Sequence, residues 1–477
     1  MAADTYQGVE TAIAAATPAI ERICAEVWEH AELSLEEVAS AQVHIRELEA
    51  AGFTITSRGT SGQETAFIAD WELGSDCPRI GFLPEYDALP GLGNASVARQ
   101  EPAPNGKTSG HGCGHNLLGA GCTGAAIALK VILEQEGIPG LVRVYGCAAE
   151  ETTGAKVFMA RDGLFDDLDA CLAWHSAPIA ATGLVRTAAV NNVSVEFFGR
   201  TAHAGTDPWN GRSALDALEL FCHGLNLMRE HVKPTVRIHY VVESGGETPN
   251  VVPDYTRLRM FIRDENREGV ESTTQWAREL AQGAAMGTQT RAEFTVAFGL
   301  YDLLPNTPLV ERLFTHLHAV GVPAWSEEEQ AFARECQRNF GAAEIGMAPQ
   351  PLPLLPDRAE GGSTDVGDVS WNTPTVAFVY PSFPLGIGLH TWPVTACGGM
   401  SIGTKSALGA ATIMTRLAWD LLTDAELRTA ARDDFDTRRA GRPFVSPLAD
   451  VDTTSESTRA AAHQPKDGAD EMVEPGV

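Results

Sequence analysis

The sequence has few basic residues for its length. Lysine and arginine number 35 against 63 aspartates and glutamates, so the 477-residue chain carries a formal net charge of −28 at pH 7. A surface with this excess of negative charge repels phosphate backbones and anionic lipid headgroups. We therefore expect neither nucleic acid nor a membrane as a partner, whereas a locally cationic site for a small molecule stays open.

Long apolar segments and a disulfide pattern are also missing. No window holds about 18 uninterrupted apolar residues, the length that a membrane-spanning helix needs. The first residues, 1–5, lack the basic and apolar regions of a secretory signal peptide. The nine cysteines are odd in number and scattered, which favours reduced, buried thiols over a disulfide framework. Together these absences predict a cytoplasmic protein.

Apolar strands alternate with helices over the first 190 residues, which predicts an α/β domain with a mixed sheet between helices. The clearest strands are 79–83, 141–147 and 169–175, and polar residues lie at the end of each. Because the carboxyl ends of parallel strands meet at one edge of a sheet, we expect a site there. Residues 6–51 are predicted to be helical, with one helix starting at Pro18.

The pattern changes near residue 191. The next 110 or so residues predict the order β-α-β-β-α-β of a ferredoxin-like unit. We interpret 191–300 as an inserted domain that serves as a lid or a dimerisation domain. The catalytic domain would then be discontinuous, comprising 1–190 and 301–440, and the polar, charged tail 441–477 is predicted to be disordered.

A thiol and two imidazoles lie on a glycine-rich turn, Gly110–Asn116, between an apolar strand and an expected helix. Glycine lets the backbone bend tightly, and Cys113 and His115 are residue types that bind borderline-soft metals. By itself this turn is equally well explained as a glycine turn with an incidental cysteine and histidines. The remaining chain has to decide between the two interpretations.

Three further strand ends or turns carry possible metal ligands, namely the pair Glu150 and Glu151, then His175, and then His390. A lone histidine at a strand end is usually a hydrogen-bonded structural residue, and a Glu-Glu pair is usually a solvated helix start. The set is more specific, because an α/β sheet brings strand ends together. One carboxylate can then bind a metal while its neighbour acts as a general base, and a bound ion activates water at neutral pH.

These stretches resemble, in order along the chain, the aminoacylase/carboxypeptidase group of co-catalytic metallopeptidases, the M20 peptidase family. Within it, the sequence is most similar to the amidohydrolase branch that contains the B subunit of p-aminobenzoyl-glutamate hydrolase. The matching stretches are the following: 85–89, 105–106, 110–119, 145–147, 150–151, 174–175, 211–217, 244–246, 249–252, 363–371 and 389–392. The resemblance implies a zinc-peptidase-like catalytic fold. It also implies cleavage of an amide between an aromatic acyl group and an amino acid, such as p-aminobenzoyl-glutamate to p-aminobenzoate and glutamate.

The resemblance also implies roles for individual residues. Cys113 would bridge two divalent ions, Mn²⁺ or Zn²⁺, and His115 and His175 would bind different ions. Glu151 and His390 would complete the two ligand sets. Glu150 would be the general base.

His203, in the expected insert, would by the same resemblance reach the partner subunit's site and stabilise the oxyanion. That role implies a homodimer or a larger oligomer. A hetero-oligomer with a similar subunit is the alternative, since the related hydrolase has two similar subunits. His111 is not required by the ligand pattern, and we expect it to have a supporting or structural role.

Four residues are candidates for holding the substrate. Asn250 follows a glycine-rich turn, and Arg263 ends a strand where a guanidinium could bind a carboxylate with two hydrogen bonds. Ser363 and Thr364 follow two glycines and could donate hydrogen bonds. Alternative functions on the same scaffold are a dipeptidase, another N-acyl-amino-acid hydrolase or an aromatic aminohydrolase. The non-enzyme alternative is an accessory metal-binding subunit without turnover. Against it, this sequence has the general base and all the expected ligands, some of which a degenerate subunit should have lost.

Overall fold

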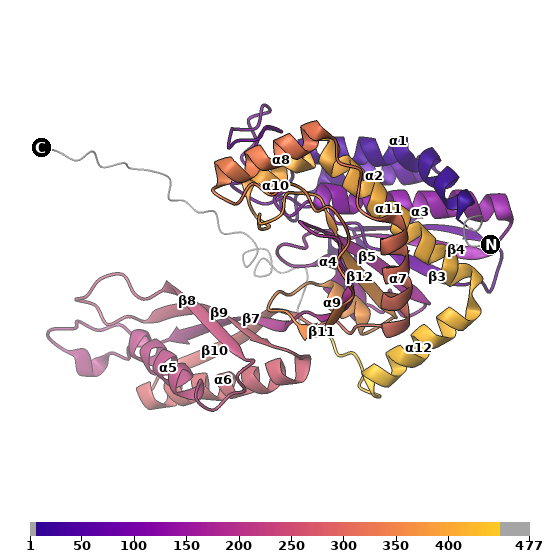
Figure 1. Cartoon of the computed structure of the whole chain (residues 1–477). Helices are drawn as coiled ribbons and strands as arrows, with labels where there is room; N and C mark the ends of the chain where they lie inside the picture. Colours follow the sequence, from indigo (N-terminus) through magenta and orange to yellow (C-terminus); the bar gives the residue numbers. More distant parts are fainter. Residues whose placement is uncertain (1–5, 449–477) are drawn as a thin grey trace, which may run out of the picture.

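The computed structural model describes residues 6–448, and its larger part is built on a six-stranded mixed sheet (Figure 1). The strands lie in the order β1-β2-β4-β3-β5-β12. Their bounds are Thr54–Arg58 (β1), Phe67–Leu73 (β2), Arg79–Phe82 (β3), Gly140–Gly146 (β4), Ala170–Ala177 (β5) and Thr375–Pro381 (β12). Strands β1, β2 and β4 pair antiparallel, and β4, β3, β5 and β12 pair parallel. The predicted α/β class with a mixed sheet is confirmed.

The three central parallel strands β4, β3 and β5 have their carboxyl ends on the same side of the sheet. Phe82 of β3 lies opposite Val144 of β4 and Leu172 of β5, and all three side chains are buried. Strands that are apolar on both faces are typical of a parallel sheet covered by helices. The segments that follow β3, β4 and β5 therefore start from one edge.

Helices α1 (Gln7–His30), α3 (His115–Glu136) and α11 (Ser401–Thr423) pack on one another, and α3 and α11 also contact the sheet. Within the described residues, α3 is the one helix long and apolar enough to cross a membrane. However, 89% of its apolar window is buried inside the protein. Its small residues allow close packing, since a Cβ at Gly124 would lie 2.2 Å from Ile20. α3 therefore has the burial of a core helix.

The helix start predicted at Pro18 is wrong, because α1 begins at Gln7 and runs through the proline. Proline removes one backbone hydrogen bond and normally kinks or ends a helix. Buried apolar residues lie on both sides of it, with Val9 and Ile13 before it and Ile20 and Ile23 after it. Packing of this continuous apolar side keeps the segment helical across the proline.

The insert forms a second sheet with its own core. The strands are β7 (Ala189–Phe198), β8 (Arg237–Ser244), β9 (Tyr255–Asp264) and β10 (Arg291–Leu300), and the helices are α5 (Ala214–Met228) and α6 (Arg267–Thr288). The sheet is antiparallel in the order β10-β7-β9-β8, and the chain order of the six elements is the predicted one. The hydrophobic cluster of the insert is separate from the cluster of the larger part. Figure 1 shows the insert as a lobe beside the larger part.

The other elements complete the larger part. Their bounds are α2 Val38–Ala50, α4 Ala155–Arg161, β6 Gly183–Arg186, α7 Thr307–Val320, α8 Glu327–Phe340, β11 Leu355–Ala359, α9 Val366–Ser370, α10 Trp392–Gly398 and α12 Ala425–Arg439, with short 3-10 turns at Thr60–Gly62 and Pro208–Asn210. Strands β6 and β11 pair parallel as a small separate sheet. Helix α4 contacts α9, which packs on β5 and β12.

The tail predicted to be disordered from residue 441 is ordered in its first part. The Tyr301 hydroxyl donates to the Val445 carbonyl and accepts from the Val445 N–H, both at 3.0 Å, and Leu448 is fully buried. A few apolar residues within a polar segment are enough to hold it against the body. Residues 449–477, which make up the rest of that prediction, lie outside the described residues.

Candidate metal centre

The glycine-rich turn lies between β3 and α3 and brings its cysteine and histidine against the end of β5. Gly114 precedes α3 with φ +79°, and a Cβ there would lie 2.3 Å from the Ser176 hydroxyl oxygen. Only glycine meets both demands, since it tolerates a left-handed backbone and has no side chain to clash. His115 therefore starts α3 directly beside the strand that carries His175.

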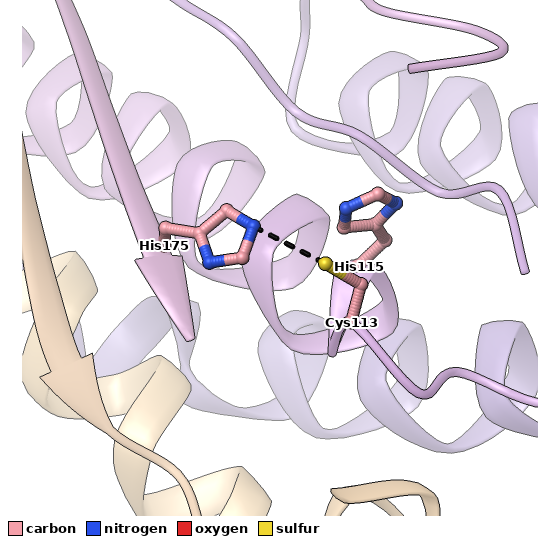
Figure 2. Close-up of side chains that lie close together, drawn as sticks. All are labelled: Cys113, His115 and His175. Carbon is pink, nitrogen blue, oxygen red and sulfur yellow. Dashed lines mark hydrogen bonds between the residues drawn. The ribbon is translucent and has the colours of Figure 1, made fainter. Parts of the chain in front are cut away.

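Cys113, His115 and His175 lie close together, as Figure 2 shows. The Cys113 sulfur lies 3.4 Å from Nε2 of His175, and the rings of His115 and His175 are nearly perpendicular. Nδ1 of His175 donates to the Ser176 carbonyl at 2.8 Å, which leaves the lone pair of Nε2 facing the thiol. Ligand atoms of the three residues lie within 4.8 Å of one another.

The predicted pair of carboxylates follows β4 in a tight turn. Ala149 has a left-handed backbone with φ +57°, and after it Oε2 of Glu150 and Oε1 of Glu151 each lie 4.0 Å from Nε2 of His115. Oε1 of Glu151 lies 3.4 Å from Nε2 of His390, and these two residues form a second group with Cys113. His390 is itself fixed by its backbone, because it has φ +59° and its N–H donates to the Gly112 carbonyl at 2.8 Å.

A third group joins His115 to two carboxylates. Nε2 of His115 lies 3.4 Å from Oε2 of Glu85 and 4.0 Å from Oε2 of Glu150. Glu85 was not among the site residues predicted from the sequence, although it opens one of the matching stretches. Its position directly after an apolar parallel strand was the signal that could have found it.

Asp87 orients His115 and was also missed. Its Oδ1 lies 2.8 Å from Nδ1 of His115, and its Oδ2 accepts from the Ser34 hydroxyl at 2.8 Å and the Glu151 N–H at 3.0 Å. Burial by itself would raise the pKa of Asp87, but the imidazole beside it and these hydrogen bonds outweigh burial and lower the pKa to about 2. A carboxylate in this place fixes the tautomer of a metal-binding histidine.

The donor atoms fit divalent metal ions. Among the candidate ligand atoms, three are buried without a hydrogen-bond partner, namely Oε2 of Glu85, Nε2 of His115 and Oε1 of Glu151. Buried polar atoms are nearly always satisfied, so three unpartnered ligand-type atoms in one place fit a cation-binding site. Two ligands of a tetrahedral ion with bonds of roughly 2.1 Å lie about 3.4 Å apart, the separation of three donor pairs here: Cys113–His175, Glu151–His390 and Glu85–His115.

The electrostatics of the group lead to the same conclusion. Burial raises the pKa of the Cys113 thiol, and burial followed by the charges of Glu85 and Asp365 raises the pKa of Glu150. Burial and the neighbouring His115 lower the pKa of His175. Without a cation, Cys113 and Glu150 therefore tend to keep their protons, whereas burial of Glu151 is outweighed by the His390 side chain beside it, which lowers the pKa of that carboxyl; a divalent ion would stabilise the thiolate and the carboxylates.

His111 has a structural position. Its Nε2 lies 2.9 Å from the Val27 carbonyl at the end of α1, and the side chain is buried. It belongs to none of the three groups formed by the described residues. The expectation of a supporting role stays a prediction.

The predicted substrate residues fall into two sets. The Arg263 guanidinium donates to the Ser363 hydroxyl at 2.8 Å, and Thr364 follows, so β9 of the insert meets the segment before α9. Asn250 and His203 lie together elsewhere in the insert, where the Asn250 carbonyl accepts from the Ala204 N–H at 3.0 Å. His203 is exposed, and its Nδ1 accepts from the Gly205 N–H at 3.1 Å. Within the part of the chain that the structure describes, the hydrogen bonds of these two residues stay within the insert.

Comparison with known proteins gives consistent results. A 36% identical relative, aligned over 93% of this chain and 98% of its own length, is the B subunit of p-aminobenzoyl-glutamate hydrolase from Escherichia coli strain K12. The human Xaa-Arg dipeptidase is 29% identical over 88% of this chain and 89% of its own length. A Bacillus subtilis structure described as a dinuclear metal-binding peptidase of the M20 family shares the fold, with a TM-score of 0.56 at 18% identity, covering 86% of this chain and 99% of the other.

The profile of peptidase family M20/M25/M40 matches residues 85–382, which include four of the five predicted metal ligands and Glu150. His390 lies just beyond the matched range. Family membership and the donor set together support divalent metal ions as the cofactor. From its sequence, its fold and the site at the sheet edge, this chain is a hydrolase that belongs to peptidase family M20/M25/M40.

Proposed function

We propose that this protein is a metal-dependent amidohydrolase that cleaves the amide between an aromatic acyl group and an amino acid. The substrate we favour is p-aminobenzoyl-glutamate, which would give p-aminobenzoate and glutamate. One observation carries the reaction class, namely three metal-type donor pairs beside Glu150, whose side chain is 14% exposed and reachable. The name of the 36% identical relative supports the substrate.

The ligand roles that we propose follow the three groups. Cys113 is the member shared by the two groups that contain His175 and His390, which supports a bridging role. His115 and His175 would bind different ions, and Glu151 and His390 would complete the two sets. Manganese and zinc both suit this mixed sulfur, nitrogen and oxygen set. When bound, such ions lower the pKa of water and polarise a carbonyl.

Glu150 would carry the proton in this reaction. It would take a proton from the attacking water as the oxygen bonds to the amide carbon, and deliver it to the departing nitrogen as the C–N bond breaks. The products would be the acid and the free amine. Its neighbour Glu151 is held in place, because its carboxylate contacts His390 and its N–H donates to Asp87. Among the described residues, Glu150 has no comparable contacts and is freer to move a proton.

The insert would contribute in two ways. Arg263 and Ser363 would hold the substrate carboxylate where the two parts of the chain meet, with Thr364 beside them and Asn250 as a further donor. We also propose that 191–300 is a domain distinct from 1–190 and 301–440, and that it acts as a lid or a dimerisation unit.

The edge of the insert sheet supports a role in dimerisation. Strand β8 is an edge strand, and its Val241 and Val242 are 56% and 49% exposed. Unpaired edge strands readily pair with another chain. A second copy there would allow the exposed His203 to serve the partner's site as an oxyanion stabiliser. A hetero-oligomer with a similar subunit is the alternative to a homodimer. We also propose that the protein is located in the cytoplasm.

The test is release of p-aminobenzoate by protein loaded with Mn²⁺ or Zn²⁺, beside protein stripped with a chelator. We expect metal-dependent release, loss of activity by at least about 100-fold in Glu150→Ala, and retention of bound metal in that variant. Glu328→Ala, an exposed glutamate on α8, is the control and should match the unsubstituted protein. Full activity of the metal-free protein would refute the proposal, and activity surviving in Glu150→Ala would refute the assignment of the base.

A dipeptidase is the second candidate, because the human relative is an Xaa-Arg dipeptidase. If metal-loaded protein binds two ions but releases no p-aminobenzoate, dipeptides and other N-acyl amino acids are the next substrates to test. Activity that appears only when a similar subunit is added would instead indicate an accessory role.

A further inference from the structure

A lysine is completely buried beneath the candidate metal centre. Lys156 belongs to α4, and its side chain has no exposed surface. Its Nζ lies 2.7 Å from Oε1 of Glu85 and 2.5 Å from Oδ1 of Asp365. A buried ammonium is tolerable only when nearby charges compensate it, and here two carboxylates do so.

This arrangement fixes the Glu85 carboxylate. Glu85 follows β3, and its backbone is paired with Cys147 after β4 in an isolated parallel bridge. With the backbone held by this bridge and Oε1 held by Lys156, the direction of Oε2 is set. That oxygen faces Nε2 of His115 at 3.4 Å.

The contact between Glu85 and His115 leaves two buried polar atoms without a hydrogen-bond partner. Asp87 lies 2.8 Å from Nδ1 of His115, so the proton is expected on Nδ1 and the lone pair on Nε2. Nε2 and Oε2 face each other in a buried place, and neither has a hydrogen-bond partner. Buried polar atoms without a partner cost free energy, and a cation between these two atoms would satisfy both. A separation of about 3.4 Å is what two ligands of one tetrahedral ion would show.

We propose that Glu85 is a further metal ligand of this centre, paired with His115 on one ion, and that Lys156 is the residue that positions it. Asp365 accepts a second hydrogen bond from the Lys156 ammonium and helps to compensate its charge. The inference rests on the proposed function, because it adds a ligand to the metal site assumed there. It gives the buried lysine a function that the family resemblance does not supply.

The test measures bound metal rather than activity. Protein stripped of metal is dialysed against buffered free Zn²⁺, and the bound ions are counted by mass spectrometry and their affinities obtained by competition with a chromophoric chelator. We expect two ions in the unsubstituted protein. In Glu85→Gln one ion should bind at least about tenfold more weakly, while the other is little changed.

Glu329→Gln is the matched control. Glu329 is also buried and paired with a lysine, Lys405 at 2.7 Å, but it lies on α8 and both of its oxygens have partners. We expect this variant to bind both ions as the unsubstituted protein does. If Glu85→Gln does not fold, Glu85→Asp keeps the charge beside Lys156 but withdraws the oxygen by one methylene, and it should weaken the same ion.

The role of Lys156 is tested by a double-mutant cycle. Lys156→Met should weaken the same ion as Glu85→Gln, and the double variant should be no weaker than Glu85→Gln, because the lysine acts through that carboxylate. Equal affinities for both ions in Glu85→Gln and the unsubstituted protein would overturn the inference while leaving the proposed function intact. If the unsubstituted protein binds no metal at all, the proposed function fails first.

Discussion

Replacing Asp87 by Asn should weaken metal binding more than its effect on stability explains. Asp87 is 1% exposed and accepts three hydrogen bonds, from His115, Ser34 and Glu151. Asparagine keeps the shape but has one acceptor oxygen, so its amide group must face at least one N–H donor. A buried donor left without a partner costs about 1–3 kcal/mol, which is the expected loss in free energy of unfolding of the metal-free protein.

The effect on metal affinity has a separate cause. A neutral amide holds the His115 ring less firmly and makes its Nε2 less basic, and removal of such a partner typically reduces metal affinity 10–100-fold. That range corresponds to about 1.4–2.7 kcal/mol of binding free energy. Urea denaturation of metal-free protein measures the stability, and competition with a chelator for Zn²⁺ measures the affinity.

A second buried Asp–His pair in the same chain provides the control. Asp420 on α11 lies 2.8 Å from Nε2 of His316 on α7, in contact with neither Asp87 nor His115. Asp420→Asn should lower stability by a similar amount and leave the Zn²⁺ affinity unchanged. The reasoning would be refuted if Asp87→Asn kept the affinity within twofold, or if Asp420→Asn lost as much affinity.

Two further predictions concern stability. Gly114→Ala should lower the free energy of unfolding by about 2–4 kcal/mol in urea denaturation, because φ +79° disfavours alanine and the new Cβ meets the Ser176 hydroxyl; an unchanged midpoint would contradict this. His44 is fully buried, and burial lowers its pKa to about 3. Below an unfolded pKa near 6.5 the unfolded chain binds the extra proton, so stability should fall by about 1.4 kcal/mol per pH unit as the pH drops toward 3. In His44→Gln this contribution to the pH dependence of the free energy of unfolding should be absent. Urea denaturation of both metal-free proteins at pH 5 and pH 7 measures the difference.

Most of the fold could be predicted because its patterns are local. Strands such as 141–147 and helices such as 270–286 follow from apolar runs and helical spacing, and the structure has them as β4 and α6 within a few residues. The helix start at Pro18 failed because burial of the whole helix side outweighs the preference of one residue. The prediction of disorder from residue 441 was wrong for residues 441–448. Composition is polar there, and it gives no sign that the single residue Leu448 is buried.

The sequence by itself determined the chemistry of the site. A thiol, imidazoles and paired carboxylates at strand ends indicate a metal-dependent hydrolase, since residue type and position along the strand are properties of the chain alone. Only the tertiary structure decided which atoms meet. Glu85, His115 and Lys156 come from three separate elements, and their contacts depend on the register of β3 and β4 and on the packing of α4. Contacts between segments far apart in the chain are set by packing of the whole core, and no local pattern encodes them.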